Sequence, residues 1–372
     1  MRVLHVIPSL SMGGAERLTL DICNELNNHT NIEVRLLILH NKIEYDISEY
    51  NFPIIHINAT FKLSILRSNS YQIDEYIQLL NDFKPDVIHS HLFEAEVFTR
   101  CYLLNNIKYV SHIHDNIVEL KNNNIFSLRT KNELIKLFER KWILNKYTKT
   151  GNIFITISND TYNYIDSNLS KTEGLKFYKL LNAINYKKFS PTKERKSTKI
   201  LKLISVGSLV KKKNHTFLID VIKELNSLSI KAELIILGDG PLREQLENKV
   251  EEYDLTSVIH FKGNVTNVPD YLNDATLYVH SATYEPFGLV LLEAMASGLP
   301  VVSLDGRGNK DIVIDGYNGY FITQNDPLEM ARKISVIASS DRLYNLMSNN
   351  AKSFAKDFDI EGYVNQLITI YS

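Results

Sequence analysis

Short apolar runs rich in β-branched residues alternate with longer amphipathic segments along the whole chain, and this alternation restricts the fold more than any other feature. A first series of runs lies at residues 3–7, 34–39, 54–57, 87–89, 108–113 and 153–157, and a second at 201–206, 234–237, 258–261, 277–280 and 301–303. Strands that alternate with helical segments are typical of βαβ units with parallel pairing. The sequence therefore predicts an α/β protein with two doubly wound, Rossmann-like halves.

A polar and highly charged segment at residues 187–199, with Pro191 inside it, separates the two series. This composition is typical of an interdomain linker, and 372 residues suffice for two domains with separate cores. We expect an N-terminal domain at 1–190, a linker at 191–199 and a C-terminal domain at 200–355. Because doubly wound sheets bind ligands beyond the carboxyl ends of their strands, we expect functional loops of both domains to face one cleft.

The segment from Glu285 to Gly298 places two carboxylates around the start of a short apolar helix. Glu285 precedes this helix, Glu293 lies in its first turns, and Gly298 is a usual helix stop. The first amides of the helix lack carbonyl partners and carry the positive end of its dipole, which suits a phosphate group. These amides belong to Phe287, Gly288 and Leu289. A nucleotide sugar has a diphosphate between its sugar and its ribose, so the two glutamates would bind its two ends.

The pair Glu285 and Glu293 resembles the E-x7-E signature of retaining glycosyltransferases with the GT-B fold, in particular glycosyltransferase family four of the bacterial surface-polysaccharide type. The resemblance covers nearly the whole chain, with motifs in family order in both halves. It implies a GT-B architecture in which two Rossmann-like domains face a cleft. It also implies that Glu285 is a catalytic residue that orients the sugar hydroxyls, that Glu293 holds the ribose, and that a last helix at 356–372 rejoins the first domain.

Two first-domain motifs fit this resemblance. Gly13 and Gly14 follow the first strand and resemble the family's G-G-A-E-R opening, whose glycine contacts the donor diphosphate. Their spacing is not G-x-G-x-x-G, which disfavours a dehydrogenase. His114 ends a later strand and corresponds to the family histidine, which implies a catalytic role at the sugar. Alternation along a strand sends His112 to the same face, so either histidine could enter the site.

Four second-domain residues complete the predicted donor site. Lys213 corresponds to a family lysine that neutralises the leaving diphosphate, whereas Ser208 stands where most relatives carry Arg, and Lys211 or Lys212 could replace that cation. Gly240 lies in a turn that resembles the family's G-x-G-P, and Val265 lies in the turn that the family places under the nucleotide base.

We expect no cofactor and no bound metal. The only D-x-D sequence, at 357–359, lies far along the chain and is interpreted as a helix start, so a metal-dependent GT-A enzyme is disfavoured. Protein cations and helix amides would then neutralise the charge that Mg²⁺ otherwise neutralises.

Composition restricts the partners and the location. The 42 Lys and Arg balance 43 Asp and Glu, which disfavours a nucleic-acid binder, and only Cys23 and Cys101 are present, which excludes a disulfide framework. No signal peptide or run of about 18 apolar residues is recognisable, so we expect a cytoplasmic protein. A basic amphipathic stretch at 121–150 suits peripheral contact with the anionic inner leaflet, and a solvated helix face explains it equally well.

These observations predict a retaining glycosyltransferase that moves a sugar from a nucleotide sugar, with UDP favoured by family frequency, to a lipid-linked or growing glycan for a capsule, O-antigen or exopolysaccharide. A sugar-nucleotide epimerase of the same architecture is one alternative. A non-catalytic scaffold subunit is the other, and Ser208 in place of Arg favours it.

Overall fold

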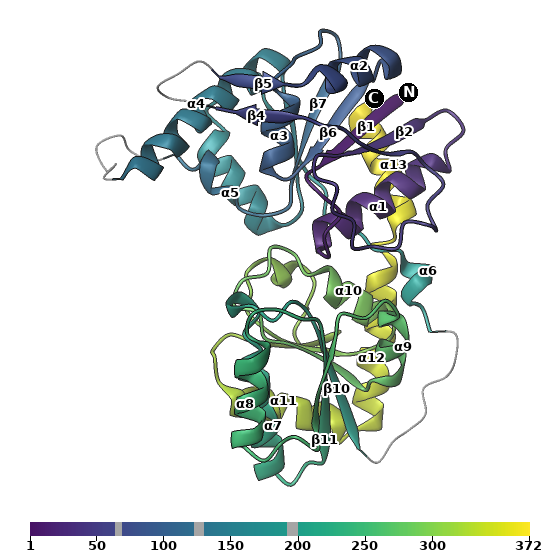
Figure 1. Ribbon diagram of the computed structural model, residues 1–372. Helices are drawn as coiled ribbons and strands as arrows, with labels where there is room; N and C mark the ends of the chain where they lie inside the picture. The colour runs from purple at the N-terminus through teal and green to yellow at the C-terminus, as the bar shows by residue number, and fades with distance from the viewer. Residues whose placement is uncertain (64–68, 123–129, 192–199) are drawn as a thin grey trace. The chain divides into compact units, whose positions relative to one another are not determined.

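The computed structural model describes residues 1–63, 69–122, 130–191 and 200–372, which form two α/β units (Figure 1). Unit 1 comprises Met1–Asn182 and Ile360–Ser372, and unit 2 comprises Ala183–Asp359. Residues 183–190, which the sequence analysis places in the first domain, thus pack in unit 2, and the segment that returns to unit 1 begins at Ile360. The expected linker at 191–199 lies outside the described residues apart from Pro191.

Unit 1 is built on a parallel sheet of seven described strands in the order β3-β2-β1-β6-β7-β8-β9. Its elements are β1 (Arg2–Ile7), α1 (Gly14–Asn27), β2 (Glu33–Ile38), β3 (Ile54–His56), β4 (Thr60–Lys62), β5 (Ser70–Gln72), α2 (Asp74–Phe83), β6 (Val87–His91), α3 (Phe93–Thr99), β7 (Lys108–Ile113), η1 (Val118–Leu120), α4 (Lys131–Thr150), β8 (Ile153–Thr156), α5 (Asn159–Leu169), β9 (Lys176–Lys179) and, from the end of the chain, α13 (Ile360–Tyr371). Helix α13 packs against α1 (Figure 1).

Unit 2 is built on a parallel sheet of six described strands in the order β12-β11-β10-β13-β14-β15. Its elements are α6 (Tyr186–Phe189), β10 (Leu201–Val206), η3 (Lys211–Lys213), α7 (His215–Ser227), β11 (Ala232–Leu237), α8 (Arg243–Glu252), β12 (Ile259–Gly263), α9 (Val268–Asp274), β13 (Leu277–His280), α10 (Leu289–Ala296), β14 (Val301–Leu304), η4 (Gly308–Asp311), β15 (Gly319–Ile322), α11 (Pro327–Ala338) and α12 (Asp341–Lys356).

In each sheet, the chain first adds strands on one side of the initial strand and later adds strands on its other side. In unit 1 the chain adds β2 and β3 on one side of β1 and then begins the other side with β6. In unit 2 it adds β11 and β12 on one side of β10 and then begins the other side with β13. At such a switch point the connections leave to opposite faces, and the loops at the carboxyl ends open a crevice for ligands. The pairs β1/β6 and β10/β13 are therefore the places where each fold can hold a site.

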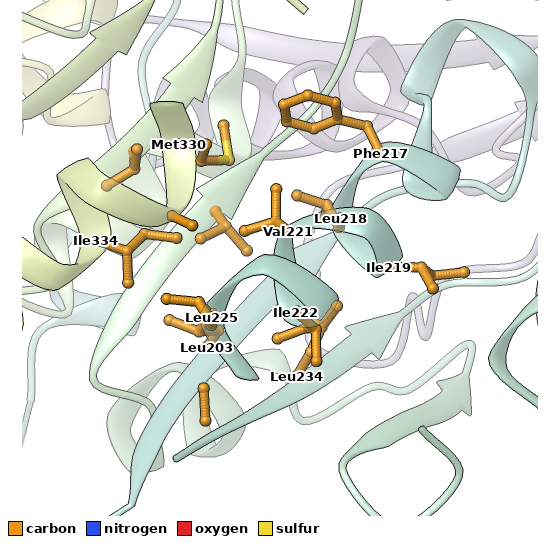
Figure 2. Packing of buried hydrophobic residues seen from close by; sticks show 14 of the residues in the cluster. Leu203, Phe217, Leu218, Ile219, Val221, Ile222, Leu225, Leu234, Met330 and Ile334 are labelled. Atoms are coloured by element: carbon orange, nitrogen blue, oxygen red, sulfur yellow. The ribbon is translucent and has the colours of Figure 1, made fainter. Parts of the chain in front are cut away.

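Apolar side chains between helices and sheet hold these strands in position. In unit 2, helices α7 and α11 pack against each other over strands β10 and β11, with Leu225, Val221 and Ile334 fully or almost fully buried (Figure 2). Burial of one such side chain contributes about 1.5–3 kcal/mol, so a rigid base supports the loops above it. Among the described helices, none combines the length and the apolar character that crossing a membrane requires.

Candidate functional site

An ion pair occupies the switch point of unit 2. Lys213 follows β10 and Glu285 follows β13, and Nζ of Lys213 donates a hydrogen bond to Oε2 of Glu285. Their side chains retain 19% and 10% exposure, so the pair is partly withdrawn from water. The sequence analysis gives these residues separate roles, at the diphosphate and at the sugar, whereas the structure joins them.

His280, the last residue of β13, lies beside this pair. Its Nε2 lies 3.3 Å from Oε2 of Glu285 but is not aligned for a hydrogen bond. Burial alone would raise the pKa of Glu285, but the charge of Lys213 and the neighbouring His280 lower it to about 2. Burial lowers the pKa of His280. The site therefore holds a carboxylate that stays ionised at neutral pH, with a cation in direct contact.

The backbone of the loop after β14 fixes Glu285. The amide of Glu285 donates to the carbonyl of Gly306 at 2.7 Å, and the amide of Gly308 donates to the carbonyl of Glu285 at 3.0 Å. A Cβ at Gly308 would lie 1.9 Å from the carbonyl oxygen of Pro286, so only glycine allows this approach. The side chain of Asn309 closes the loop by accepting from the amide of Gly306 at 2.9 Å.

Helix α10 begins directly after this loop. Gly288 adopts φ 103° as its N-cap, Leu289 is its first residue, and the preceding Phe287 is buried and packs against Phe358. The first amides of α10 have no carbonyl one turn earlier in the helix, as the motif predicts. Glu293 lies in the next turn, and Gly298 at φ 77° follows the helix end.

The turns that contain Ser208 and Gly240 pack directly on each other. The amide of Leu209 donates to the carbonyl of Asp239 at 2.9 Å, and a Cβ at Gly240 would approach the carbonyl oxygen of Leu209 to 2.7 Å. Ser208 is exposed. The amide of Gly238 donates to the carbonyl of Gly263 at 2.8 Å, and the half-buried Val265 follows two residues later. The carboxyl ends of β10, β11 and β12 thus form one continuous backbone surface.

In unit 1, Gly13 caps α1 and Gly14 is the first residue of that helix. The amide of Gly13 donates to Oη of Tyr45 at 3.1 Å, and the Tyr45 hydroxyl donates to the carbonyl of Gly13 at 2.8 Å. The Tyr45 side chain therefore accepts from the amide that the sequence analysis assigns to a phosphate. No feature of the local sequence predicts this contact, because Tyr45 comes from the loop after β2.

His112 and His114 lie on the same face of the sheet, as their spacing predicts. Their rings stack with centroids 4.2 Å apart. His112 is fully buried at the end of β7, whereas His114 keeps 8% exposure just beyond it. His5, His89 and His91 adjoin them across β1 and β6. Sequence reasoning missed these three and His280, although a histidine at the carboxyl end of a buried strand was an available signal for His91 and His280. His5 and His89 lie inside their strands and gave no such signal.

Within the basic stretch at 121–150, residues 131–150 form helix α4, which begins with a Thr130–Glu133 capping box, and residues 123–129 lie outside the described residues. Not all of its basic groups face solvent. The Arg140 guanidinium donates to the carbonyls of Leu120 and Asn168 at 3.1 and 3.2 Å. Leu134 on the same helix is 51% exposed.

Comparison with known proteins gives matches across both units. Residues 12–171 match a family model described as Glycosyltransferase Family 4, and residues 187–354 match one described as Glycosyl transferases group 1.

Three known proteins illustrate these matches. The N-acetylgalactosamine-N,N'-diacetylbacillosaminyl-diphospho-undecaprenol 4-alpha-N-acetylgalactosaminyltransferase of Campylobacter jejuni is 25% identical over 95% of this chain and 94% of its own length. The UDP-Gal:alpha-D-GlcNAc-diphosphoundecaprenol alpha-1,3-galactosyltransferase of Escherichia coli is 23% identical over 100% of this chain and 96% of its own. The crystal structure of Anabaena HepE in complex with UDP has a TM-score of 0.79 at 19% identity and covers 100% of this chain and 99% of that one. HepE has also been crystallised with UDP-glucose.

Proposed function

This chain belongs to glycosyltransferase family four and has the GT-B fold, and from this premise we propose that it transfers a sugar from a UDP-sugar to a lipid-linked glycan in the synthesis of a bacterial surface polysaccharide. Enzymes of this family retain the anomeric configuration, need no metal and take the sugar from a nucleotide donor. The observation that carries the proposal is the Lys213–Glu285 pair at the switch point of unit 2.

The charges at this switch point suit a nucleotide diphosphate sugar. The ionised Glu285 accepts hydrogen bonds from sugar hydroxyls, and Lys213, held in place by Glu285 before the donor arrives, contacts the diphosphate. The amides of residues 287–289, which lie at and just before the start of α10, bind the same phosphates, and Glu293 binds the ribose. The adjoining turns with Ser208, Gly240 and Val265 receive the nucleoside.

Unit 1 supplies the other contacts of the proposed reaction. Gly13 and Gly14 bring backbone close to the diphosphate once the contact with Tyr45 is released, and His114 contacts the transferred sugar. The acceptor hydroxyl attacks on the face that the diphosphate leaves, and a phosphate oxygen of the donor takes its proton. Lys213 and the helix amides stabilise the negative charge on the departing UDP, because charge that develops in a partly dehydrated site is stabilised best by groups already in place.

The two enzymatic relatives support a lipid-linked acceptor, since both are named for action on undecaprenol-linked diphosphates. Such an acceptor lies at a membrane, and helix α4 with its basic and apolar side chains provides a surface for an anionic leaflet. We therefore propose that the protein acts in the cytoplasm at the inner face of the plasma membrane.

The experiment that tests this function is a panel of UDP-, GDP- and dTDP-sugars with EDTA present, with and without an undecaprenyl-diphosphate-linked sugar. We expect one UDP-sugar to release UDP faster when the acceptor is added. Glu285→Gln and Lys213→Met should each lower kcat/KM by roughly 10- to 100-fold, because each removes a charge-assisted contact. Glu251→Gln and Lys231→Met change the same charges at exposed positions and should leave the rate unchanged.

Other outcomes would identify the rival functions. Conversion of a UDP-sugar to its epimer without any acceptor would identify an epimerase. Failure to bind every nucleotide sugar would contradict the donor site and favour the non-catalytic scaffold.

A further inference from the structure

A chain of hydrogen bonds crosses one face of the unit 1 sheet through imidazole rings. Nε2 of His114 lies 2.9 Å from Nδ1 of His91, and Nε2 of His91 lies 2.8 Å from Nδ1 of His5. Nε2 of His5 lies 3.4 Å from Oη of Tyr371, which also contacts Nδ1 of His89. The chain thus connects the carboxyl end of β7 with helix α13.

The sheet register explains why these rings meet. His5 on β1 pairs with His89 on β6, and His91 on β6 pairs with His112 on β7. Because alternate residues of a strand share a face, all the rings of these strands project to the side that Tyr363 and Tyr371 of α13 cover. The strands β1 and β6 form the switch point of unit 1, so the chain lies at the position where this fold can hold a site.

The cluster also resembles a metal site, and its hydrogen bonds argue against one. Two triads of histidine ligand atoms, His5/His89/His91 and His91/His112/His114, each lie within 4.8 Å of one another. His91 belongs to both triads, but each of its ring nitrogens already lies within hydrogen-bond distance of a neighbouring ring. A metal ion would need a bare nitrogen from every ligand, all directed at one point. Here the nitrogens are directed at one another in pairs.

All the hydrogen bonds that link these rings must have the same donor-to-acceptor direction. Burial lowers the pKa of every histidine in it, to about 3 for His5 and His114, so each ring is neutral and carries one N–H. A neutral ring has one donor and one acceptor nitrogen, so a ring that donates on one side must accept on the other. The Tyr371 hydroxyl can accept twice but donate only once, and His5 and His89 are the two acceptors in contact with this buried O–H. If that O–H is to be satisfied, Tyr371 donates to one of these rings and accepts from the other, which leaves two arrangements that differ by the reversal of every bond.

The terminal ring, His89, distinguishes the two arrangements. Its Nε2 is buried and has no hydrogen-bond partner. In one arrangement this atom is an N–H without an acceptor, and in the other it is a bare nitrogen without a donor. Among buried backbone groups, donors without an acceptor are rarer than acceptors without a donor, and the same preference applied to the imidazole selects the bare nitrogen. The nearby Arg100 cation, which also lowers the pKa of His89, favours the bare nitrogen as well.

We propose that His91, His5 and Tyr371 are positioning residues that hold His114 as its Nδ1–H tautomer, with this N–H directed outward as a donor to an oxygen of the bound sugar. In this arrangement His89 donates to Tyr371, Tyr371 to His5, His5 to His91, and His91 to His114. The sugar contact of His114 rests on the proposed function, whereas its tautomer does not.

Titratable and charged groups from the neighbouring elements also face this chain of hydrogen bonds. Beyond the chain itself they are His112 on β7, Tyr363 on α13, Arg100 at the end of α3, and Cys23 on α1, which acts on Tyr371. Burial raises the pKa of the Cys23 thiol and of both tyrosine hydroxyls and lowers that of His112, so these four groups stay neutral at pH 7. Arg100 is thus the cation among these facing groups, and it acts at the His89 end.

The test is the nitrogen NMR spectrum of tag-free, ligand-free protein with ¹⁵N-labelled histidine, because protonated and bare ring nitrogens have distinct shifts and couplings. The signals are assigned with single variants, and the exposed His56→Gln serves as the matched control. We expect His5, His89, His91 and His114 all to carry the proton on Nδ1 at pH 7. An Nε2–H tautomer at His114 would overturn the proposal, as would stoichiometric binding of Zn²⁺ that the His91 variants abolish.

Two variants of His91 separate positioning from general stability. His91→Asn keeps an N–H near the place of Nδ1 and should preserve the His114 tautomer, whereas His91→Leu removes that donor. With the UDP-sugar selected by the donor panel above, His91→Leu should lower kcat roughly 5- to 10-fold with little change in KM, and His91→Asn should recover most of the loss. Equal losses in both variants, with an unchanged His114 signal, would contradict a positioning role.

Failure of this inference and failure of the proposed function remain distinguishable. If no nucleotide sugar binds but the four Nδ1–H signals are present, the proposed His114 tautomer is supported and the transferase function is contradicted. If transfer occurs and His114 carries its proton on Nε2, the transferase function is supported and the proposed His114 tautomer is contradicted.

Discussion

Removal of the Lys213 charge should expose how much the buried carboxylate of Glu285 depends on it. Lys213→Met keeps most of the apolar stem of the side chain and deletes only the cation. Glu285 would remain in a site where its side chain is 10% exposed, with His280 as its nearest polar neighbour. Burial then dominates, so the pKa of Glu285 should rise from about 2 to its ordinary value of 4.5 or higher.

The size and the pH dependence of the effect follow from this pKa. Because the pKa of Glu285 is lower in the folded protein than in the unfolded chain, its ionised form contributes stability above pH 4.5, and this contribution is lost as the pH falls toward 2. At about 1.4 kcal/mol per pKa unit, the difference between 4.5 and about 2 gives a contribution at pH 7 of about 3.5 kcal/mol. Removing one partner of a buried ion pair typically costs about 3–5 kcal/mol of stability, and the value for Glu285 lies in this range.

Hydrogen exchange measured by mass spectrometry is the suitable assay, because it reports on each unit separately. At pH 7 the slowest amides of β13 and α10 should lose roughly a few hundredfold of their protection in Lys213→Met, since about 1.4 kcal/mol corresponds to a factor of ten. Peptides from unit 1 serve as the internal control and should not change. The double variant Lys213→Met/Glu285→Gln should recover much of the loss, because it leaves no unpaired buried charge.

Two results would refute this reasoning. Unchanged protection of β13 and α10 in Lys213→Met would mean that the ion pair does not stabilise unit 2. A loss of the same size at pH 3 as at pH 7, after correction for the intrinsic exchange rates, would mean that the effect does not arise from the ionisation of Glu285.

Three further predictions concern the loops around the site. Gly240→Val would bring a Cβ to 2.7 Å from the carbonyl oxygen of Leu209. We therefore expect the free energy of unfolding, measured by heat or urea, to fall by about 1–3 kcal/mol and UDP binding, measured by calorimetry, to weaken. Unaltered UDP affinity would contradict the role of this turn. Gly298→Ala should destabilise unit 2 by about 1–2 kcal/mol in urea because Gly298 has φ 77°, and Gly298→Asn should cost less since Asn tolerates this conformation. Ser208→Arg adds a cation at an exposed turn, so the KM for the donor should fall about tenfold, and no change would show that the turn does not reach the diphosphate.

The sequence predicts the repetitive parts of this protein well. Each apolar run assigned to a strand overlaps a strand of the structure, and the family inferred from the Glu285–Glu293 spacing is confirmed. The strands that the sequence analysis missed are the β4–β5 hairpin, β9 and β15. β9 reads Lys-Phe-Tyr-Lys, in which charged residues flank a short apolar pair at the edge of the sheet, so it lacks the apolar run that identifies a buried parallel strand.

The contacts within the site could not be predicted in the same way. The motifs identify Lys213 and Glu285 separately, but their ion pair joins residues 72 positions apart and depends on β10 and β13 being neighbours. No sequence pattern specifies that two strands meet at a switch point. The hydrogen bond between Gly13 and Tyr45 was missed for the same reason, because it depends on where the loop after β2 lies.

The two switch points are equivalent in the topology and opposite in their chemistry. The strands β1 and β6 carry neutral histidines that burial prevents from becoming charged, whereas the loops after β10 and β13 hold an ionised carboxylate and a lysine. A nucleotide sugar has the same division, with uncharged hydroxyls on the sugar and negative charge on the diphosphate. Neutral imidazoles can donate to and accept from hydroxyls without attracting the phosphates, and a fixed lysine attracts the phosphates. Under the proposed function, the neutral histidines are therefore suited to the transferred sugar, and Lys213 is suited to the nucleotide diphosphate. This division predicts that variants of His91 affect kcat, whereas variants of Lys213 also weaken the binding of UDP itself. Titration of free UDP into both proteins decides the point, since equal loss of UDP affinity in both would mean that the two sites do not divide the donor in this way.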